Sequence, residues 1–213
     1  MTELGHSGLD IDLGDRCSHD AYAWARRSFG QRQGRAGEII DLDASFSTGL
    51  RFGAERLAMT SDGIGTKVEL AERCGVYDSL GHDLVAMVVD DLVCNGVEPC
   101  ALSNILDVDR LHEPTVDALM RGLHDAAALA RVAVVGGEIA ELGTRIGGWG
   151  PGMHFNWCAT ALGVLPGGRT PVDGSRVEVG DAVLALHSVG FRSNGFSLAR
   201  RILQRQFGER WHE

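Results

Sequence analysis

The segment His82–Cys94 constrains the fold more than any other part of the sequence, because it reads as a helix that is apolar along nearly its whole length. A helix that is hydrophobic all round has to be buried. Two adjacent carboxylates, Asp90 and Asp91, nevertheless lie in it, pointing about 100° apart. Since a buried carboxylate is costly unless it is paired or binds a metal, two interpretations stay open: a capped or salt-bridged pair, or a magnesium site formed together with substrate phosphates.

The segments around this helix supply the layers that would bury it. Strands are predicted at Arg56–Ser61, Pro99–Leu106, Val132–Val135 and Phe155–Leu165, and helices at Asp20–Gln33, Lys67–Arg73 and Glu113–Arg131. The first helix is expected to be capped by Ser18 or Asp20, after a loop or arm over residues 1 to about 20. Asp41–Gly53 is rich in turn-forming residues, and Gly136-Gly137 is expected to end the third strand.

A linker is predicted at Pro166-Gly167-Gly168, which divides the chain into domains at residues 1–166 and 167–213. A strand, Ala182–Leu186, and a helix, Phe196–Gln206, follow it. One strand and one helix cannot bury a core of their own. They are therefore expected either to pack on the first domain or to open a second one.

Composition and charge exclude several function classes. The net charge of −9 and the absence of a basic patch argue against nucleic-acid binding, and no apolar stretch is long enough to span a membrane. Five cysteines without a CxxC pair argue against a disulfide framework or a zinc site, and most of them are expected to be buried thiols. No signal peptide precedes the first helix, so a cytoplasmic location is expected.

A phosphate-binding loop is one interpretation of Asp62-Gly63-Ile64-Gly65-Thr66-Lys67, which follows a predicted strand. Glycines let backbone N–H groups approach an anion, Lys67 offers a positive charge to phosphate, and Asp62 offers a carboxylate to magnesium. The order of residues fits neither a Walker A loop nor a dinucleotide fingerprint. The alternative is an ordinary turn at the end of a strand.

Two further Gly-containing segments are candidate ligand sites. Gly136-Gly137-Glu138 follows a short apolar strand, as at the ligand edge of a sheet, although a structural turn explains it equally well. Ser188–Gly195 joins a strand to a helix, where Ser193 or Asn194 can cap the helix. The same loop can also bind an anion, and Arg192 would strengthen that site.

Taken together and in this order, the motifs resemble those of the AIR synthase (phosphoribosylformylglycinamidine cyclo-ligase) family. The matching segments are Gly8–Asp12, Ser61–Lys67, His82–Met87 with Asp90–Val93, Gly96–Pro99, Gly136–Glu138 and Ser193–Leu198. Several positions depart from the family pattern. The family's Gly-Gly-Phe-Gly loop is missing near Ser45–Gly49, and an insertion containing Gly147-Gly148-Trp149 precedes Pro151-Gly152-Met153. In addition, Asp90 replaces Asn, Ile139 replaces Thr, and Arg192 stands where His is frequent.

The resemblance implies an α/β first domain, with a mixed sheet flanked by helices that pairs with its twin in a homodimer, and the opening strand and helix of an α+β second domain. It implies an ATP- and magnesium-dependent ligase of purine synthesis. ATP would phosphorylate the formyl oxygen of formylglycinamidine ribonucleotide, an amidine nitrogen would attack the activated carbon, and phosphate would leave.

Roles for individual residues follow from the same resemblance. Lys67 and Asp91 would be catalytic, and Asp62, Asp91 and Glu138 would bind the metal. ATP phosphates would contact Asp62, Gly63, Gly65, Thr66, Lys67, Gly136 and Gly137, and the ribonucleotide would contact Arg192, Ser193, Asn194 and Gly195. Two alternatives remain open: a kinase or synthetase of the same superfamily with another substrate, or a truncated, non-catalytic nucleotide-binding remnant.

Overall fold

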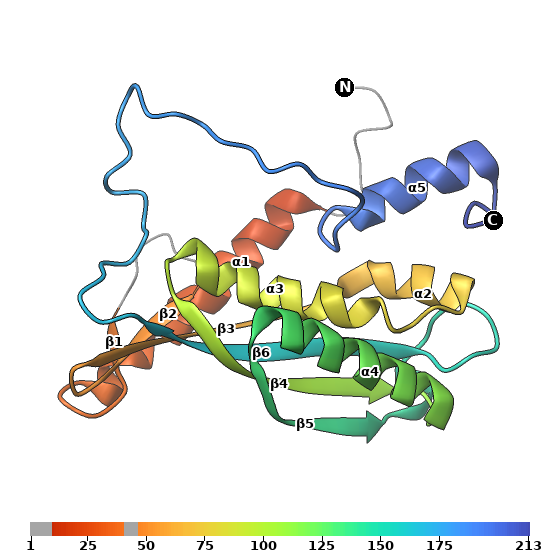
Figure 1. Cartoon of the computed structure of the whole chain (residues 1–213). Helices are drawn as coiled ribbons and strands as arrows, with labels where there is room; N and C mark the ends of the chain where they lie inside the picture. The colour runs from red at the N-terminus through yellow and green to blue at the C-terminus, as the bar shows by residue number, and fades with distance from the viewer. Residues whose placement is uncertain (1–9, 41–46) are drawn as a thin grey trace.

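The computed structural model describes residues 10–40 and 47–213, and its elements are arranged around one sheet (Figure 1). The helices are α1 (Ile11–Arg27), α2 (Val68–Cys74), α3 (Leu80–Cys94), α4 (Glu113–Ala130) and α5 (Phe196–Phe207), with short 3-10 turns η2 (Phe29–Arg32), η3 (Gly65–Lys67) and η4 (Gly143–Arg145). The strands are β1 (Glu38–Ile40), β2 (Thr48–Phe52), β3 (Glu55–Gly63), β4 (Glu98–Val108), β5 (Ala133–Glu141) and β6 (Phe155–Leu165).

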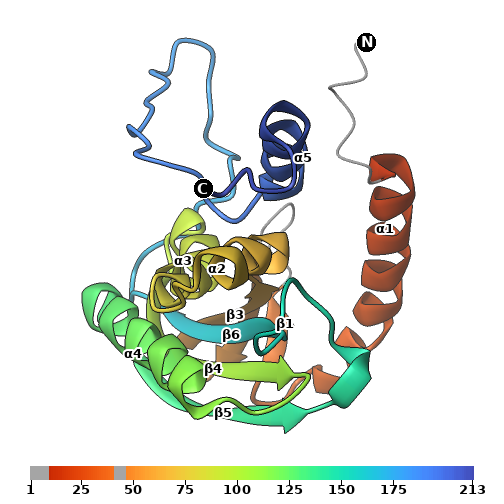
Figure 2. The ribbon, with the colours of Figure 1, turned by 90° about the vertical axis from the view of Figure 1, so that its right-hand side faces the viewer.

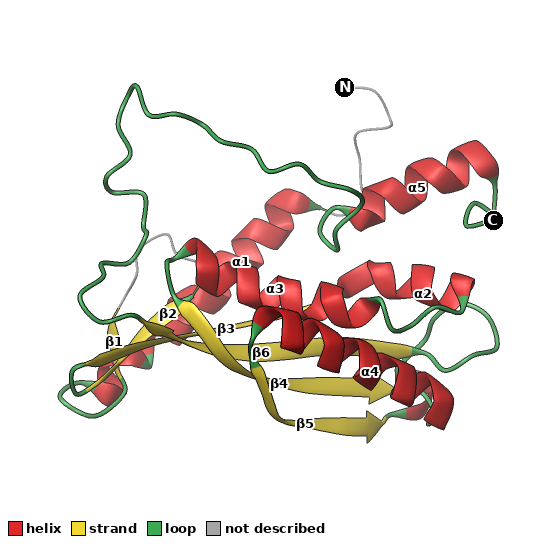
Figure 3. Ribbon diagram, viewed as in Figure 1, coloured by secondary structure: helices red, strands yellow, loops and turns green. Residues whose placement is uncertain are grey.

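The six strands form one mixed sheet in the order β1-β2-β3-β6-β4-β5. All neighbouring strands are antiparallel except β4 and β5, which are parallel. Helices α2, α3 and α4 lie over one face of this sheet, as Figure 3 shows. The predicted α/β fold with a mixed sheet flanked by helices is therefore confirmed.

Alternation along β6 explains why one face of the sheet is covered. Phe155, Trp157, Ala159 and Ala161 are buried on that face, while the residues between them are partly or fully exposed. This period of two is what a strand with one buried face requires. The apolar residues of α3 pack on the covered face, as its sequence predicted, and Leu84 is completely buried there.

Two glycines allow α3 and α4 to cross with their backbones in contact. A Cβ atom added to Gly81 of α3 would lie 2.1 Å from the carbonyl carbon of Gly122 in α4. A Cβ atom added to Gly122 would lie 1.8 Å from the carbonyl oxygen of Asp78. Because a side chain cannot occupy either position without a backbone shift, these glycines set the distance between the two helices.

The second face of the sheet is open along its centre. Met59 of β3 and Ile105 of β4 are 47% and 48% exposed, and Leu162 and Val164 of β6 are half-buried on the same face. No described helix covers these residues. The open face is thus a row of apolar side chains on paired strands.

The N-terminal helix differs from the prediction. It begins at Ile11 and not near Asp20, because the Asp10 side chain accepts a hydrogen bond of 2.8 Å from the Leu13 N–H and caps the helix well before the predicted position. None of its residues is buried, and α1 stands apart from the sheet (Figure 2). The matched segment at Gly8–Leu9 and the stretch 41–46 lie outside the described residues.

Three strand predictions are also corrected. Residues 48–52, predicted to be turns, form β2, which pairs with β3 through a tight hairpin at Gly53. Gly136-Gly137 does not end β5, because parallel pairing with β4 continues to Glu141. The predicted strand Ala182–Leu186 does not form, since among residues 10–40 and 47–213 no strand lies beside it to supply hydrogen-bond partners.

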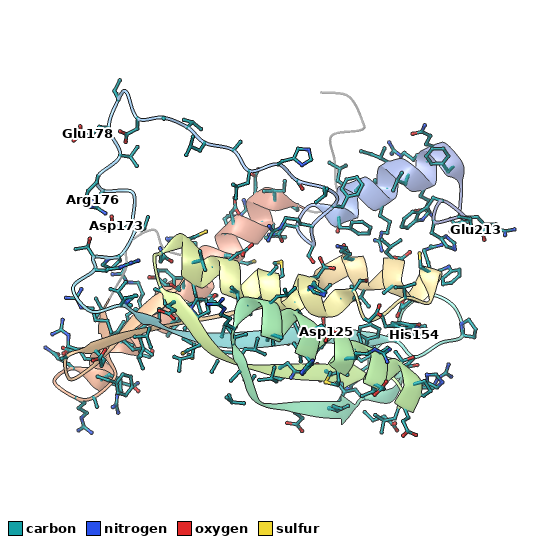
Figure 4. All side chains as sticks on the ribbon, viewed as in Figure 1. Asp125, His154, Asp173, Arg176, Glu178 and Glu213 are labelled. Atoms are coloured by element: carbon teal, nitrogen blue, oxygen red, sulfur yellow. The ribbon has the colours of Figure 1, made fainter. Side chains whose placement is uncertain are left out.

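The region after β6 combines an extended segment with one helix. Asp173, Arg176 and Glu178 lie on the segment that stands away from the sheet (Figure 4), whereas α5 returns to lie over α2 (Figure 1). The helix matches the one predicted at Phe196–Gln206, and the domain boundary near residue 166 remains a prediction. Most of the cysteines were expected to be buried, and this prediction is wrong, because four are exposed and Cys158 is half-buried. No described helix is long and apolar enough to cross a membrane.

Candidate functional site

The two carboxylates Asp62 and Asp91 form the centre of the candidate site. Asp62 lies at the end of β3 and accepts a hydrogen bond of 2.7 Å from the Gly63 N–H. Asp91 lies on α3 above the sheet, and the Thr60 hydroxyl donates a 3.0 Å hydrogen bond to its Oδ2. Because β3 runs beneath α3, the topology brings together two acids that lie 29 residues apart in sequence.

Burial is the main cause that raises the pKa of Asp91 above its ordinary value, and the negative charges of Asp62 and Asp90 raise it further. The hydrogen bond from Thr60 acts in the opposite direction. Asp62 is therefore close enough to Asp91 for its negative charge to raise the pKa of Asp91. A site with an excess of negative charge near a partly buried carboxylate favours a bound cation.

Lys67 comes after Asp62 in the predicted phosphate loop, and its side chain is held in place by contacts within the protein. Its ammonium nitrogen lies 2.7 Å from Asp83 Oδ1, with both side chains mostly buried. It also donates a 3.0 Å hydrogen bond to the carbonyl oxygen of Phe191. An ammonium group has three N–H donors, so phosphate would be the third partner of a lysine whose position is fixed.

The loop before α5 reaches the same place from the far end of the chain. Arg192 forms an ion pair with Asp90 of α3, and the Thr66 and Ser197 hydroxyls are 2.9 Å apart. Both partners of the Arg192–Asp90 pair are departures from the family pattern, and the structure joins them. The predicted substrate-binding loop thus lies beside the predicted phosphate loop.

Within this loop, Ser193 carries an unexplained polar group. The residue is buried, and its hydroxyl oxygen has no hydrogen-bond partner among the described residues. Asn194 follows, and Gly195 has a φ of +76°, which favours glycine. No Ser193 or Asn194 side chain caps α5, so the capping interpretation of these residues is wrong.

The structure requires glycine for different reasons at the two predicted phosphate-binding segments. Gly65 has a φ of +68° where the chain turns from β3 into η3. By contrast, a Cβ atom on Gly137 would lie 2.6 Å from the Asn104 carbonyl oxygen, and the Asn104 amide donates a 3.4 Å hydrogen bond to the carbonyl of Gly136. Gly137 therefore allows β5 to approach β4 closely, whereas a Cβ atom on Gly136 would meet nothing within 4 Å.

Glu138 is not brought to the other two acids. Residues Gly63, Cys158, Ile105 and Glu138 share one row across β3, β6, β4 and β5. Three strand spacings amount to about 14 Å, and this row faces the open side of the sheet, opposite α3. Within the described residues, no group of three or more Asp, Glu, His or Cys residues is placed to hold a metal ion.

Sequence reasoning missed Thr60 and Asp83, which hold Asp91 and Lys67. Thr60 stands two residues before Asp62 and so shares its face of β3; that spacing was a usable signal. Nothing local to Asp83 pointed to Lys67, because their contact depends on how α3 packs.

Comparisons with known proteins agree with the site's motifs. Residues 46–164 match the family described as "AIR synthase related protein, N-terminal domain". The phosphoribosylformylglycinamidine cyclo-ligase of Thermococcus kodakarensis is 36% identical over 208 residues, which is 98% of this chain and 60% of the relative. That of Methanothermobacter thermautotrophicus is 34% identical, over 95% of this chain and 56% of the relative.

Solved structures give a weaker likeness. A structure described as "AaThiL complexed with AMPPCP and TMP" is 18% identical, with a TM-score of 0.49 over 77% of this chain and 43% of that chain. The chain spans about 60% of the length of the first curated relatives it matches, and its family match covers more than half of its residues. The chain therefore belongs to the AIR synthase related family and carries the N-terminal domain of that family.

Proposed function

We propose that this chain takes part in the reaction named by its curated relatives, phosphoribosylformylglycinamidine cyclo-ligase, and that Asp62, Asp91 and Lys67 form its magnesium–ATP side. The observation that carries the proposal is the Asp62–Asp91 pair beside the Gly63–Lys67 loop, in a member of this family. Phosphoryl transfer depends mainly on positioning and on neutralising phosphate charge. These residues supply both.

The donor set fits magnesium. This ion is usually held by one or two carboxylates together with substrate phosphates and water, and the charge around Asp91 is unbalanced without a cation. Asp62 and Asp91 would hold the ion, and the bound ion would neutralise the transferring phosphoryl group. Glu138 lies in another row and on the other face, so it is left out of this set.

The remaining residues would position the reactants. The Lys67 ammonium, fixed by Asp83, would place its third N–H toward a phosphate oxygen. The formyl oxygen of the ribonucleotide would take the γ-phosphoryl group of ATP, and ADP would leave. An amidine nitrogen would then attack the formyl carbon, and the former formyl oxygen would leave that carbon as part of phosphate. The unpartnered Ser193 hydroxyl supports a polar ligand beside this loop.

A homodimer is part of the same proposal. The open face presents Met59, Ile105 and Leu162 on adjoining strands, and apolar rows of this kind are normally covered. A second copy that places the same face against it would bury both. Sedimentation at micromolar concentration should give twice the chain mass, and Ile105→Asp should shift the protein to the monomer. A wild-type protein that sediments as a monomer would contradict this part of the proposal.

A cytoplasmic location is proposed on the same footing. Cys17, Cys74, Cys94 and Cys100 are exposed and free, and exposed free thiols are typical of proteins in reducing compartments.

The proposal is tested by titrating ATP into the protein with and without magnesium. Asp62→Asn and Asp91→Asn should each weaken magnesium-dependent ATP binding by at least about tenfold, because each removes a charged ligand. Asp125→Asn is the matched control, since Asp125 is exposed on α4 and interacts only with His124. Unchanged affinity in both site variants, or ATP binding that is indifferent to magnesium, would refute the assignment.

A further inference from the structure

A cavity of about 400 Å³ lies next to the candidate site and shares Gly65 and Thr66 with the predicted phosphate loop. Its lining includes Gly65 and Thr66 from the turn after β3, Asn156 at the start of β6, and two arginines, Arg145 and Arg200. The arginines come from η4 and α5, so segments from three parts of the chain meet around one space. Its volume is in the range of small-molecule sites.

The wall of this cavity is formed by the insertion that distinguishes the chain from the family pattern. The Trp149 N–H donates a 2.8 Å hydrogen bond to Glu72 Oε2, and the Arg73 guanidinium lies 4.8 Å from the centre of the Trp149 ring. A Cβ atom on Gly148 would lie 2.3 Å from Glu72 Oε1. The insertion is thus fixed tightly against α2, and Gly147 and Gly148 line the cavity.

A second contact holds the same wall. His154, labelled in Figure 4 at the end of the sheet below α2, lies 3.1 Å from Glu72 Oε1 through its Nδ1. The Trp149 ring also meets His212 of the C-terminal segment edge to face, at 5.3 Å. These contacts fix the loop that carries Arg145 before any ligand arrives, which lowers the entropy cost of binding.

The charges around the cavity leave one cation without a partner. Glu69 is paired with both Arg73 and Arg200, and Glu72 is engaged by His154 and by the Trp149 N–H. Arg145 makes no side-chain hydrogen bond or ion pair with any described residue. Both acids are therefore satisfied, and the guanidinium of Arg145 remains free for an anion.

We propose that this cavity binds the phosphomonoester end of the ribonucleotide substrate. Arginine's planar guanidinium binds phosphate through two parallel hydrogen bonds, so Arg145 would be the primary contact and Arg200 the second. The Asn156 side chain and the backbone of Gly147-Gly148 would face the ribose. The identity of the ligand rests on the proposed function; the cavity and its free arginine do not. The assignment moves the substrate phosphate away from the Ser193–Gly195 loop.

Ribose 5-phosphate is the probe, titrated calorimetrically into the 213-residue protein without ATP. Arg145→Ala should weaken its binding by at least about tenfold, because a charged hydrogen-bond partner is lost. Arg121→Ala is the control and should bind as the wild type does, since Arg121 is exposed on α4 and pairs only with Asp117. Gly148→Ala, which displaces the wall without removing charge, should also weaken binding.

The same variants are titrated with magnesium–ATP, and this arm separates the two possible sources of phosphate. ATP affinity should be unchanged in Arg145→Ala; a loss equal to that for ribose 5-phosphate would assign the cavity to ATP and overturn the proposal. Equal binding of ribose 5-phosphate by the wild type and Arg145→Ala would also overturn it, as would no binding by a protein that binds ATP. Arginine-dependent ribose 5-phosphate binding without any ATP binding would leave the cavity assigned and refute the proposed function.

Discussion

Leu84 and Leu184 are the same residue type in two regions that are held together differently. Leu84 lies on α3 and is fully buried, whereas Leu184 is 89% exposed on the segment between β6 and α5. Residues 47–165 bury their apolar side chains in one core between sheet and helices. Residues 166–213 attach mainly through polar and cation–aromatic contacts to α2 and α3. Burial of apolar side chains thus stabilises residues 47–165, whereas hydrogen bonds, ion pairs and cation–aromatic contacts hold residues 166–213 in place.

The largest effect should come from testing burial directly. Leu84→Ala should lower the free energy of unfolding by about 2–5 kcal/mol, the cost of a cavity in a packed core. Leu184→Ala should change it by less than about 0.5 kcal/mol, as is usual for exposed sites. Chemical denaturation measures both. Equal losses for the two variants would mean that the segment around Leu184 is packed in solution.

Trp211→Ala should release α5 without unfolding the core. Trp211 is nearly buried; its ring packs against Phe196 at 6.5 Å, and the Arg73 guanidinium lies 5.3 Å from it. Losing this ring should cost about 2 kcal/mol of local stability, which corresponds to about 30-fold faster hydrogen exchange in Phe196–Phe207. Exchange in α3 serves as the internal control and should not change. A uniform rise in both helices would contradict the separation of the two regions.

Asp91→Asn should make the protein more stable at neutral pH while weakening magnesium binding. Because the folded pKa of Asp91 is raised, the folded state holds its proton longer than the unfolded state does. Stability contributed by this group therefore falls as pH rises from the ordinary carboxyl range through the raised value, and stays low above it.

The variant lacks this titration, so its melting-temperature advantage over the wild type should shrink as the pH falls from the raised pKa of Asp91 to the ordinary carboxyl range. Thermal melts from pH 3 to 8, without magnesium, measure the difference. An advantage that grows on acidification would show that Asp91 is stabilised in its charged form.

The smallest effect is expected for the ion pair that joins the two regions. Arg192 and Asp90 are both exposed by about half or more, and such pairs contribute about 0.2–1 kcal/mol. A double-mutant cycle with Asp90→Asn and Arg192→Gln should give a coupling energy in this range at low salt. The coupling should vanish in 1 M salt, where the screening length is about 3 Å. A coupling that survives high salt would indicate a shielded pair.

Sequence patterns predicted the fold best where a segment's own periodicity decided its structure. Phe155–Leu165 is a strand over the whole predicted range, and α4 ends within a residue of the prediction. The same reasoning placed a strand at Ala182–Leu186, whose composition is suited to one. That strand does not form, because a strand needs a neighbour and sequence alone does not say which neighbours are present.

The candidate site was predictable only in part for a related reason. The motifs identified Asp62, Lys67 and Asp91; the structure brings Asp62 close to Asp91, and Lys67 contacts Asp83 on the helix that carries Asp91. Glu138 belongs to an equally clear motif, yet two strands, β6 and β4, lie between its strand and the strand of Asp62. Strand order and helix packing determine which motif residues lie close together in space, and the local sequence around each motif predicts neither of them.

The glycine crossing between α3 and α4 has a consequence for how mutations would spread. Asp91 lies on a helix whose distance from α4 is set by Gly81 against Gly122. A methyl group at Gly122 would collide with the backbone of Asp78 just before α3, so the start of the helix that carries Asp91 would have to move. The affinity for a cation at Asp91 would then depend on Gly122, a residue that does not contact the cation. The small size of Gly122 thus restricts how far Asp91 can move relative to Asp62.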